Sequence, residues 1–351
     1  MKKIIAIALC LVMTIPMMTS CHKYEAEINV YNWGEYMANG SEGSMKIVKD
    51  FEKKFNIKVN YTTFDSNEVM YDKLKSTNLS YDVIIPSEYM VAKLISEDML
   101  APIDFANVPN SKYTMDEFKS QSYDPENKYS VPYTWGAVGI IYNKTMVQNP
   151  SKSWNILWDI SYKDNILMIN NSRDAMAIAF LKAGLNPNTA NKGDIDKATN
   201  LLKEQKPLLQ KYVMDEVFGK MEGNQAAIAP YYAGDAITMM ANNTDLDFFY
   251  PTEGTNKFVD AMCIPKNSKN QKYAEMFINY LCEPEVAAAN SEFIGYSTPN
   301  SGALELLPDE LRNNPIAYPD KNYLNDKCFY FSNLPKDIYD YMQEKFLEVI
   351  K

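Results

Sequence analysis

Aromatic and acidic side chains follow several of the predicted strands, and others lie in the predicted late hairpin and further along the chain. The residues concerned are Trp33, Glu35 and Tyr36; Ser87, Glu88 and Tyr89; Asn171 and Asp174; Tyr232 and Asp235; Phe258 and Asp260; and Tyr296. No histidine or lysine stands among them. Open α/β sheets bind their ligands beyond the carboxyl ends of the strands, so we expect these side chains to meet in one cleft.

This mixture of side chains suits an organic cation. An ammonium group that leaves water without new partners costs several kcal/mol, so a site must supply carboxylates and other hydrogen-bond acceptors. An aromatic face adds about 0.5 to 2 kcal/mol by cation–π attraction, and rings also cover the methylene groups between charges. Taken singly, the rings fit a role as core residues and the acids a role as helix caps. Their joint placement after strands favours the binding cleft.

The composition removes most catalytic and metal chemistries. The chain has one histidine, His22, and two arginines, Arg173 and Arg312. Histidine triads and histidine metal clusters therefore lack their parts. No run of oxygen ligands has the regular spacing of a calcium loop. We expect neither a metal nor a cofactor.

Two alternatives to an amine receptor remain open. A receptor of the same fold could bind a sugar, a metal ion or an amino acid, although an amino acid needs a cationic clamp and only Arg173 is placed for one. A surface glycosidase could instead pair Glu35 with Asp174 or Asp260 across the cleft. Nothing in the sequence requires catalysis, so we expect that the protein is not an enzyme.

Length and charge narrow the class of protein further. A chain of 351 residues, at roughly 150 residues per domain, predicts about two domains. The formal net charge is −10, from 35 lysines and arginines against 45 aspartates and glutamates. Nucleic acid is not an expected partner, because neutralising phosphates requires a basic surface.

The N-terminus has the pattern of an export signal. Lys2 and Lys3 precede an apolar stretch over residues 4–18. The segment Met18-Thr19-Ser20-Cys21 resembles the bacterial lipobox, in which the cysteine is acylated and becomes the new N-terminus. We predict a signal peptide at residues 1–20 and a lipid anchor at Cys21, which places the protein at the outer face of the cytoplasmic membrane, or in the periplasm where an outer membrane exists. An uncleaved membrane anchor is the alternative, but the apolar run is short for a span.

Three further cysteines belong to the body of the chain. Cys263, Cys282 and Cys328 are an odd number, which argues against a disulfide framework. Their spacing fits no zinc site, so we expect buried free thiols.

The elements that would position the cleft residues alternate between strand and helix. The hydrophobic pattern predicts strands at residues 27–33, 57–64, 81–86, 129–143, 165–170, 225–230, 247–250 and 258–264, and helices at 44–55, 68–74, 89–95, 154–160, 174–183, 194–206, 234–242 and 271–282. The strands at 247–250 and 258–264 are expected to form a hairpin around the turn at 251–256. No repeat of fixed period appears, so two open α/β lobes are the economical interpretation.

Four segments resemble one known family. They are Val30-Tyr31-Asn32-Trp33-Gly34-Glu35-Tyr36, Tyr81-Asp82-Val83-Ile84-Ile85-Pro86-Ser87-Glu88-Tyr89, Tyr129-Ser130-Val131-Pro132-Tyr133-Thr134-Trp135-Gly136 and Ile294-Gly295-Tyr296-Ser297-Thr298-Pro299-Asn300. In this order they resemble the spermidine/putrescine-binding proteins of polyamine ABC importers, over essentially the whole mature chain. The resemblance implies a monomeric, two-lobed extracytoplasmic receptor of the type II periplasmic-binding-protein fold, which closes on a polyamine and delivers it to a membrane permease.

The same resemblance implies the lobe boundaries and the crossings between lobes. The N-terminal lobe would comprise residues 21–135 and 261–300, and the C-terminal lobe residues 136–260 and 301–351. Each lobe is expected to be an open mixed sheet flanked by helices.

The resemblance also assigns roles to the cleft residues. The aromatic walls would be Trp33, Tyr36, Tyr89, Tyr232, Phe258 and Tyr296. The amine-binding carboxylates would be Glu35, Asp174 and Asp260, with Ser87 as a polar site residue and Asp235 matching an acid of the putrescine-preferring branch.

Departures from the family pattern leave the choice of polyamine open. Asn171 stands where the spermidine-binding branch has another carboxylate, and Gly34 where a hydroxyl residue is common. Phe258 and Tyr232 replace tryptophans. An amide accepts a hydrogen bond from an ammonium group but brings no charge, so putrescine and spermidine both remain possible ligands.

Overall fold

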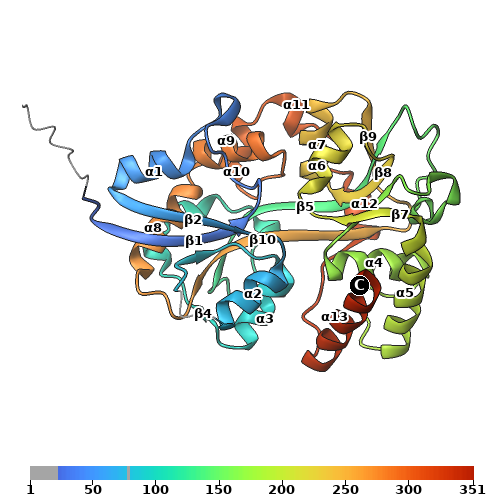
Figure 1. Ribbon diagram of the computed structural model, residues 1–351. Coiled ribbons are helices and arrows are strands. Elements are labelled where there is room, and N and C mark those ends of the chain that lie inside the picture. The colour runs from blue at the N-terminus through green and yellow to red at the C-terminus, as the bar shows by residue number, and fades with distance from the viewer. Residues whose placement is uncertain (1–22, 77–79) are drawn as a thin grey trace, which may run out of the picture.

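The computed structural model describes residues 23–76 and 80–351 (Figure 1). The predicted signal peptide and the predicted lipidation site, Cys21, lie outside the described residues. Within the described part, no helix is long and apolar enough to cross a bilayer.

The strands form one continuous network of pairings. They are β1 (Ala26–Trp33), β2 (Ile57–Phe64), β3 (Val83–Ile84), β4 (Leu100–Ala101), β5 (Ser130–Asn143), β6 (Ile166–Ile169), β7 (Leu209–Val213), β8 (Ile228–Tyr232), β9 (Leu246–Phe249), β10 (Thr255–Pro265) and β11 (Cys328–Phe329). The main order is β2-β1-β3-β10-β5-β8-β6-β7, with β4 and β11 paired to β10 and β9 paired to β5. The pairs β1·β2 and β6·β7 are parallel, whereas β5 and β10 run antiparallel to each other.

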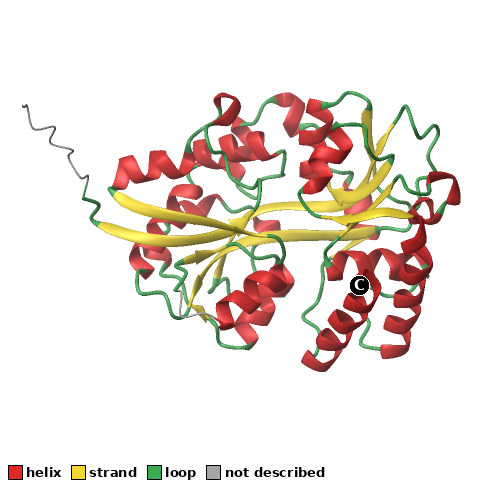
Figure 2. Ribbon diagram, in the orientation of Figure 1, coloured by secondary structure: helices red, strands yellow, loops and turns green. Residues whose placement is uncertain are grey.

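Helices cover this strand network on both sides, as Figure 2 shows. They are α1 (Ile47–Phe55), α2 (Asn67–Ser76), α3 (Glu88–Ser96), α4 (Ser172–Lys182), α5 (Lys192–Gln205), α6 (Glu216–Glu222), α7 (Ala233–Asn242), α8 (Gln271–Leu281), α9 (Pro284–Ile294), α10 (Ser301–Leu306), α11 (Asp309–Arg312), α12 (Lys321–Asp326) and α13 (Lys336–Ile350). The architecture is therefore mixed α/β, as the alternating pattern predicts.

Two groups of buried side chains flank the middle of the sheet. One, here called the N-terminal core, is built mainly from residues 28–133 and 258–296. The other, the C-terminal core, is built from residues 138–249 and 334–349. Strands β5 and β10 pass from one core to the other through the centre of the molecule (Figure 1). The predicted lobe boundaries agree broadly with this division but stay a prediction, and α10 packs on α9 across the expected boundary after residue 300.

A register shift in the central pair places one of the expected site residues. In the antiparallel pairing of β5 with β10, Asp260 lies opposite Thr134 and Ala261 lies opposite Pro132, so that Tyr133 is an extra residue. Proline has no N–H to donate to the ladder, and such bulges bend a strand and re-aim its side chains. Asp260 also forms an isolated bridge with Ser87. The segment that follows β3 therefore lies next to the middle of β10, beside the bulge.

Most of the predicted elements are confirmed, and two expectations are wrong in detail. The segment predicted as a helix at 154–160 is a 3-10 turn over Trp154–Trp158. The prediction did not include β4, β7, β11, α6 or the helices from α9 to α13. The expected hairpin does not form, because β9 pairs with β5 and not with β10.

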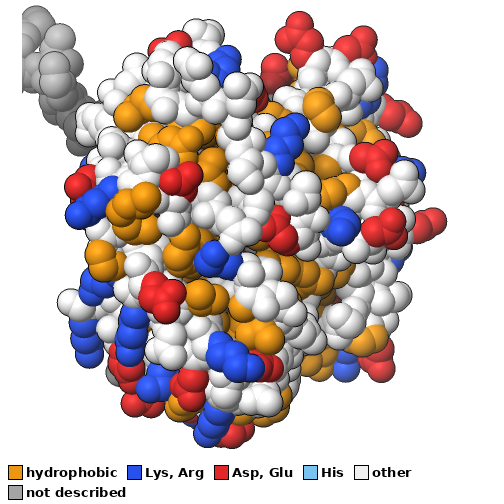
Figure 3. Space-filling view, turned by 90° about the vertical axis from the view of Figure 1, so that its right-hand side faces the viewer, with side chains coloured by type: hydrophobic (Ala, Val, Ile, Leu, Met, Phe, Trp, Pro, Cys, Tyr) orange, Lys and Arg blue, Asp and Glu red, His pale blue; other side chains and the backbone are white. Residues whose placement is uncertain are grey.

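The cysteines agree with the expectation of free thiols. Cys263 and Cys282 are buried and unbridged, and Cys328 is free and half-buried. On the face of the molecule in Figure 3, basic and acidic side chains are interspersed.

Candidate ligand-binding site

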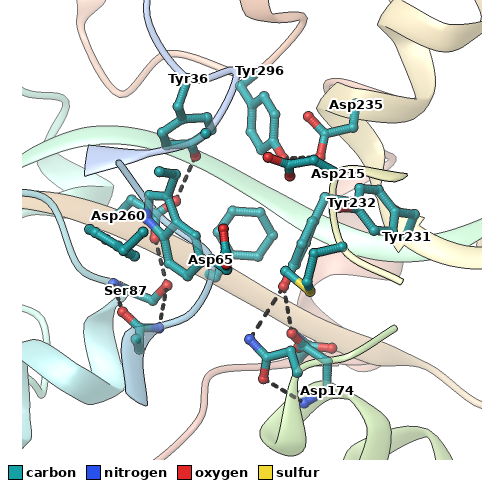
Figure 4. Close-up of a pocket in the computed structure, with 18 of the residues that line it drawn as sticks. Tyr36, Asp65, Ser87, Asp174, Asp215, Tyr231, Tyr232, Asp235, Asp260 and Tyr296 are labelled. Atoms are coloured by element: carbon teal, nitrogen blue, oxygen red, sulfur yellow. Dashed lines mark hydrogen bonds between the residues drawn. The ribbon is translucent and has the colours of Figure 1, made fainter. Parts of the chain in front are cut away.

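A pocket lies between the two cores, beside the central strands. It has ≈ 620 Å³ of space between atoms, part of it open to solvent. Its lining residues are Trp33, Gly34, Tyr36, Phe64, Asp65, Asn67, Ser87, Glu88, Tyr89, Asn171, Asp174, Met214, Asp215, Tyr231, Tyr232, Asp235, Asn256, Phe258, Asp260, Tyr296 and Phe331. Figure 4 shows how the labelled side chains converge from both sides.

The structure brings eleven of the twelve expected site residues to this pocket. They are Trp33, Tyr36, Ser87, Tyr89, Asn171, Asp174, Tyr232, Asp235, Phe258, Asp260 and Tyr296. Glu35 is exposed and lines an adjoining hollow instead, together with Asp215 and Asp235. Its expected role in binding remains a prediction.

Sequence reasoning missed several lining residues. Asp65 directly follows a correctly predicted strand, β2, so the rule that identified the other acids could have found it. Asp215 follows β7, a strand with no clear sequence signal, and was hidden for that reason. Asn256 and Phe331 come from segments whose paths only the fold reveals.

Asp260 is the best-held acid of the pocket. Its side chain is 3% exposed. Ser87 Oγ donates to Oδ1 at 2.6 Å, and Tyr36 Oη donates to Oδ2 at 2.6 Å. Burial raises the pKa of Asp260 to about 6, while the two donors act in the opposite direction. The carboxylate is therefore fixed in position and destabilised by desolvation, and a cation would relieve that cost.

Asp174 forms a second acidic point, in the first turn of α4. Asn171 caps this helix, since its Oδ1 accepts from the backbone N–H of Arg173 at 3.0 Å. Tyr232 Oη donates to Asp174 Oδ2 at 2.7 Å, and Asn256 Nδ2 donates to Oδ1 at 2.9 Å. Burial raises the pKa of Asp174 to about 7. The helix N-terminus and these donors hold the carboxylate at the pocket wall.

Asp235 forms a third acidic point, in the first turn of α7. Tyr296 Oη donates to its Oδ2 at 3.0 Å, joining the C-terminal core to the N-terminal core. Burial raises the pKa of Asp235 well above its usual range, and the nearby carboxylates of Asp215, Glu35 and Asp260 raise it further. Asp235 therefore has Tyr296 as a hydrogen-bond donor but lies near three other carboxyl groups.

Aromatic rings form the walls between these acids. Tyr36 and Tyr296 meet edge to face with ring centroids 4.8 Å apart, and Tyr232 meets Phe258 in the same way at 5.4 Å. Phe258 lies over Gly136, where a Cβ would come within 2.9 Å of the ring. Trp33 packs on Phe64 with ring centroids 4.6 Å apart. Such walls suit the methylene groups of an extended ligand.

Two further charged residues, Glu88 and Arg173, contact residues that line the pocket. Glu88, 1% exposed, accepts from the backbone N–H groups of Val259 and Phe331, and burial, followed by the charge of Asp260, raises its pKa to about 8. Arg173 lies 4.5 Å from the ring centre of Phe331 and 5.3 Å from that of Tyr89. It forms no ion pair among the described residues and does not line the pocket, so it supplies no anion clamp there.

The electrostatics of the pocket are one-sided. Six of its lining residues are carboxylic acids: Asp65, Glu88, Asp174, Asp215, Asp235 and Asp260. None of the lining residues is lysine, arginine or histidine. In the described ranges, no group of three or more histidines, cysteines or acids is arranged to hold a metal ion. The arrangement can bind a cation.

A two-part α/β chain with such a pocket between its parts defines a binding protein for a small solute. The chain belongs to the family of bacterial extracellular solute-binding proteins, whose model matches residues 46–319. The fold predicted from the sequence, a two-lobed arrangement like that of the periplasmic binding proteins, and the predicted family resemblance are both confirmed.

Named relatives make the likeness more specific. The chain is 35% identical over 292 residues to the spermidine/putrescine-binding periplasmic protein of Escherichia coli K12, covering 83% of this chain and 82% of that one. It is 28% identical over 312 residues to the putrescine-binding periplasmic protein PotF of the same organism, covering 83% of each chain.

Solved structures agree with these relatives. A putative spermidine/putrescine ABC transporter protein from Listeria monocytogenes superposes with a TM-score of 0.88 at 38% identity, covering 92% of this chain and 98% of that one. The substrate-binding protein PotD from Streptococcus pneumoniae superposes with a TM-score of 0.76 at 35% identity, with the same coverage.

Proposed function

We propose that this protein is a receptor for a linear polyamine, of the spermidine or putrescine type, and that it delivers this ligand to an ABC importer. The observation that carries the proposal is the pocket lined by six carboxylic acids and aromatic walls without a basic side chain. A polyamine offers several ammonium groups joined by short apolar chains, which matches acids separated by rings. The names of the relatives point to the same ligands.

Each class of pocket residue has a role in this function. Asp260 and Asp174 replace water around ammonium groups, since charged hydrogen bonds are the strong ones. The rings of Tyr36, Tyr296 and Phe258 cover the methylene groups and add cation–π attraction. Ser87 serves by holding one oxygen of Asp260, so that the carboxylate is ordered before the ligand arrives.

Closure of the two lobes would complete the site. We place the lobes at residues 21–135 with 261–300 and at 136–260 with 301–351, with β5 and β10 as the crossing strands. The hydrogen bond from Tyr296 to Asp235 joins elements of the two cores, so it would break on opening. A ligand that touches both sides binds the closed state better and shifts the equilibrium toward it.

Location and partners follow from the N-terminal pattern. A signal peptide at residues 1–20 would export the chain, and acylated Cys21 would hold it at the outer face of the cytoplasmic membrane or in the periplasm. A monomeric receptor there would present its ligand to permease subunits of the importer. The function needs neither a cofactor nor catalysis.

Calorimetry on the purified protein, freed of retained ligand by denaturation and refolding, tests the proposal. We expect saturable binding of putrescine or spermidine with one ligand per chain. Absence of binding by both at millimolar concentration would overturn it. Mass spectrometry of the ligand retained after native purification is the companion experiment, and a sugar or an amino acid found there would contradict a polyamine receptor.

A further inference from the structure

Asp215 is an exposed residue that lines the pocket and has no partner of opposite charge among the described residues. It precedes α6 and lines both the pocket and the adjoining hollow that contains Glu35. In the described part of the chain it makes no side-chain hydrogen bond and no ion pair. Its charged neighbours are Asp65, Glu35 and Glu216, and partial desolvation of the side chain together with these acids raises its pKa. A carboxylate among carboxylates leaves a place for a cation.

Asp215 makes a close approach to Gly34. A Cβ atom built on Gly34 would overlap Oδ2 of Asp215 and lie 3.3 Å from its Cγ. The φ angle of Gly34 lies outside the left-handed region, so the backbone conformation does not require glycine here. A larger residue at position 34 would instead force the Asp215 carboxylate to move from its present place.

The two residues come from opposite sides of the pocket. Gly34 follows β1 of the N-terminal core, whereas Asp215 follows β7 of the C-terminal core. The same is true of the acids around them, since Asp65 follows β2 and Asp235 begins α7. Like charges that approach across a cleft oppose its closure, and a cation between them removes that cost.

We propose that Asp215, together with Asp235, binds one terminal ammonium group of the ligand, and that Gly34 is the residue that makes room for it in the closed state. This inference rests on the proposed polyamine-receptor function and assigns the ligand class within it. Four of the six pocket acids form three corners, at Asp260, at Asp174 and at Asp215 with Asp235, and Asp65 lies between these corners in the view of Figure 4. A triamine fills all three, whereas a diamine leaves one corner without a cation, so the preferred ligand is a triamine.

The variant Asp215→Asn tests whether the Asp215 carboxylate binds the ligand. Glu216→Gln is the matched control. Glu216 is the next residue, carries the same charge, pairs with Lys211 at 2.8 Å and lines neither hollow. We expect the wild-type protein to bind spermidine at least about tenfold more tightly than putrescine. Loss of a charged hydrogen bond should weaken spermidine binding by roughly tenfold or more in Asp215→Asn, and by less than about twofold in Glu216→Gln.

A double-mutant cycle tests the role of Gly34. We expect Gly34→Ala to weaken spermidine binding in the wild-type background, because the new methyl group displaces the Asp215 carboxylate. In an Asp215→Ala background the same change should have little further effect, since the obstructing oxygen is gone. Melting temperatures close to that of the wild type confirm that the variants fold.

The outcomes separate this inference from the proposed function. A wild-type protein that binds no polyamine overturns both. A wild-type protein that binds spermidine, with equal affinities in Asp215→Asn and Glu216→Gln, overturns the inference alone, as does a preference for putrescine. Equal effects of Gly34→Ala in both backgrounds overturn the role of Gly34.

Discussion

The hydroxyl of Tyr36 donates to Oδ2 of Asp260 at 2.6 Å, and this bond connects the loop after β1 to the middle of the crossing strand β10. Ser87 holds the other carboxylate oxygen. Because both oxygens already have a donor, the acid keeps one orientation without a ligand. The carboxylate is thus ordered before an ammonium group binds, so binding costs little side-chain entropy at Asp260.

Asp260→Asn is expected to weaken polyamine binding by roughly 10- to 150-fold, because an ammonium group loses a charged partner inside a buried site. Asp247→Asn is the matched control, since Asp247 accepts from Tyr142 outside the pocket and its loss changes the net charge equally. Isothermal titration calorimetry with spermidine and putrescine gives the affinities. Equal affinities in the two variants would remove Asp260 from the site.

Asn171→Asp is expected to strengthen spermidine binding by about fivefold at pH 8. Asn171 caps α4 through its Oδ1, and its Nδ2 lies 3.5 Å from Tyr232 Oη, beside Asp174. Aspartate caps a helix as well as asparagine does, so the change adds a charge worth about 1 kcal/mol near the ligand without removing the cap. Asn171→Ser keeps a capping side chain but adds no charge, and a gain of affinity in that control would contradict the electrostatic explanation.

The sequence predicted the acids and rings that follow regular strands, because those positions depend only on local pattern. Asp174 and Asp235 were found in this way, whereas Asp260 lies within a strand, β10. Their geometry depends on contacts that no local pattern contains, such as the bulge at Pro132 and the bridge from Ser87 to Asp260.

The missed residues have a common physical cause. Asp215 follows β7, whose mixed burial gives no clean alternation, so the rule about strand ends had no strand to use. The expected hairpin of β9 and β10 failed because proximity in sequence suggests pairing, whereas both strands pair with the long strand β5. Long-range pairing is a property of the whole sheet.

Ligand binding is expected to stabilise the protein more at pH 8 than at pH 5. In the ligand-free fold burial raises the pKa of Asp174 to about 7 and that of Asp260 to about 6. The folded state therefore binds more protons than the unfolded state in this range, and ligand-free stability rises as the pH falls from 8 to 5. The pKa of Glu97 is lowered from 4.5 to about 2. Glu97 therefore changes the pH dependence of stability only below about pH 5, outside the range from pH 8 to pH 5.

The measurement is the melting temperature with and without saturating spermidine. Binding needs ionised carboxylates, so the ligand-induced rise in melting temperature should shrink between pH 8 and pH 5 while the ligand-free value increases. An equal rise at both pH values would show that these acids are already ionised before the ligand binds.

Tyr339→Phe is expected to lower the apparent affinity for the ligand by roughly 2- to 12-fold without touching the pocket, since one neutral hydrogen bond contributes about 0.5 to 1.5 kcal/mol. Tyr339 on α13 donates to Glu68 on α2 at 3.0 Å, which joins the C-terminal core to the N-terminal core. Removing this bond favours the open state, and the affinity falls with the fraction of closed protein.

Tyr341→Phe is the control, because Tyr341 donates to Asp196 of α5 on its own side. Small-angle scattering of the ligand-free protein should report a larger radius of gyration for Tyr339→Phe alone. Identical scattering and affinity in the two variants would show that the Tyr339–Glu68 bond does not contribute to closure.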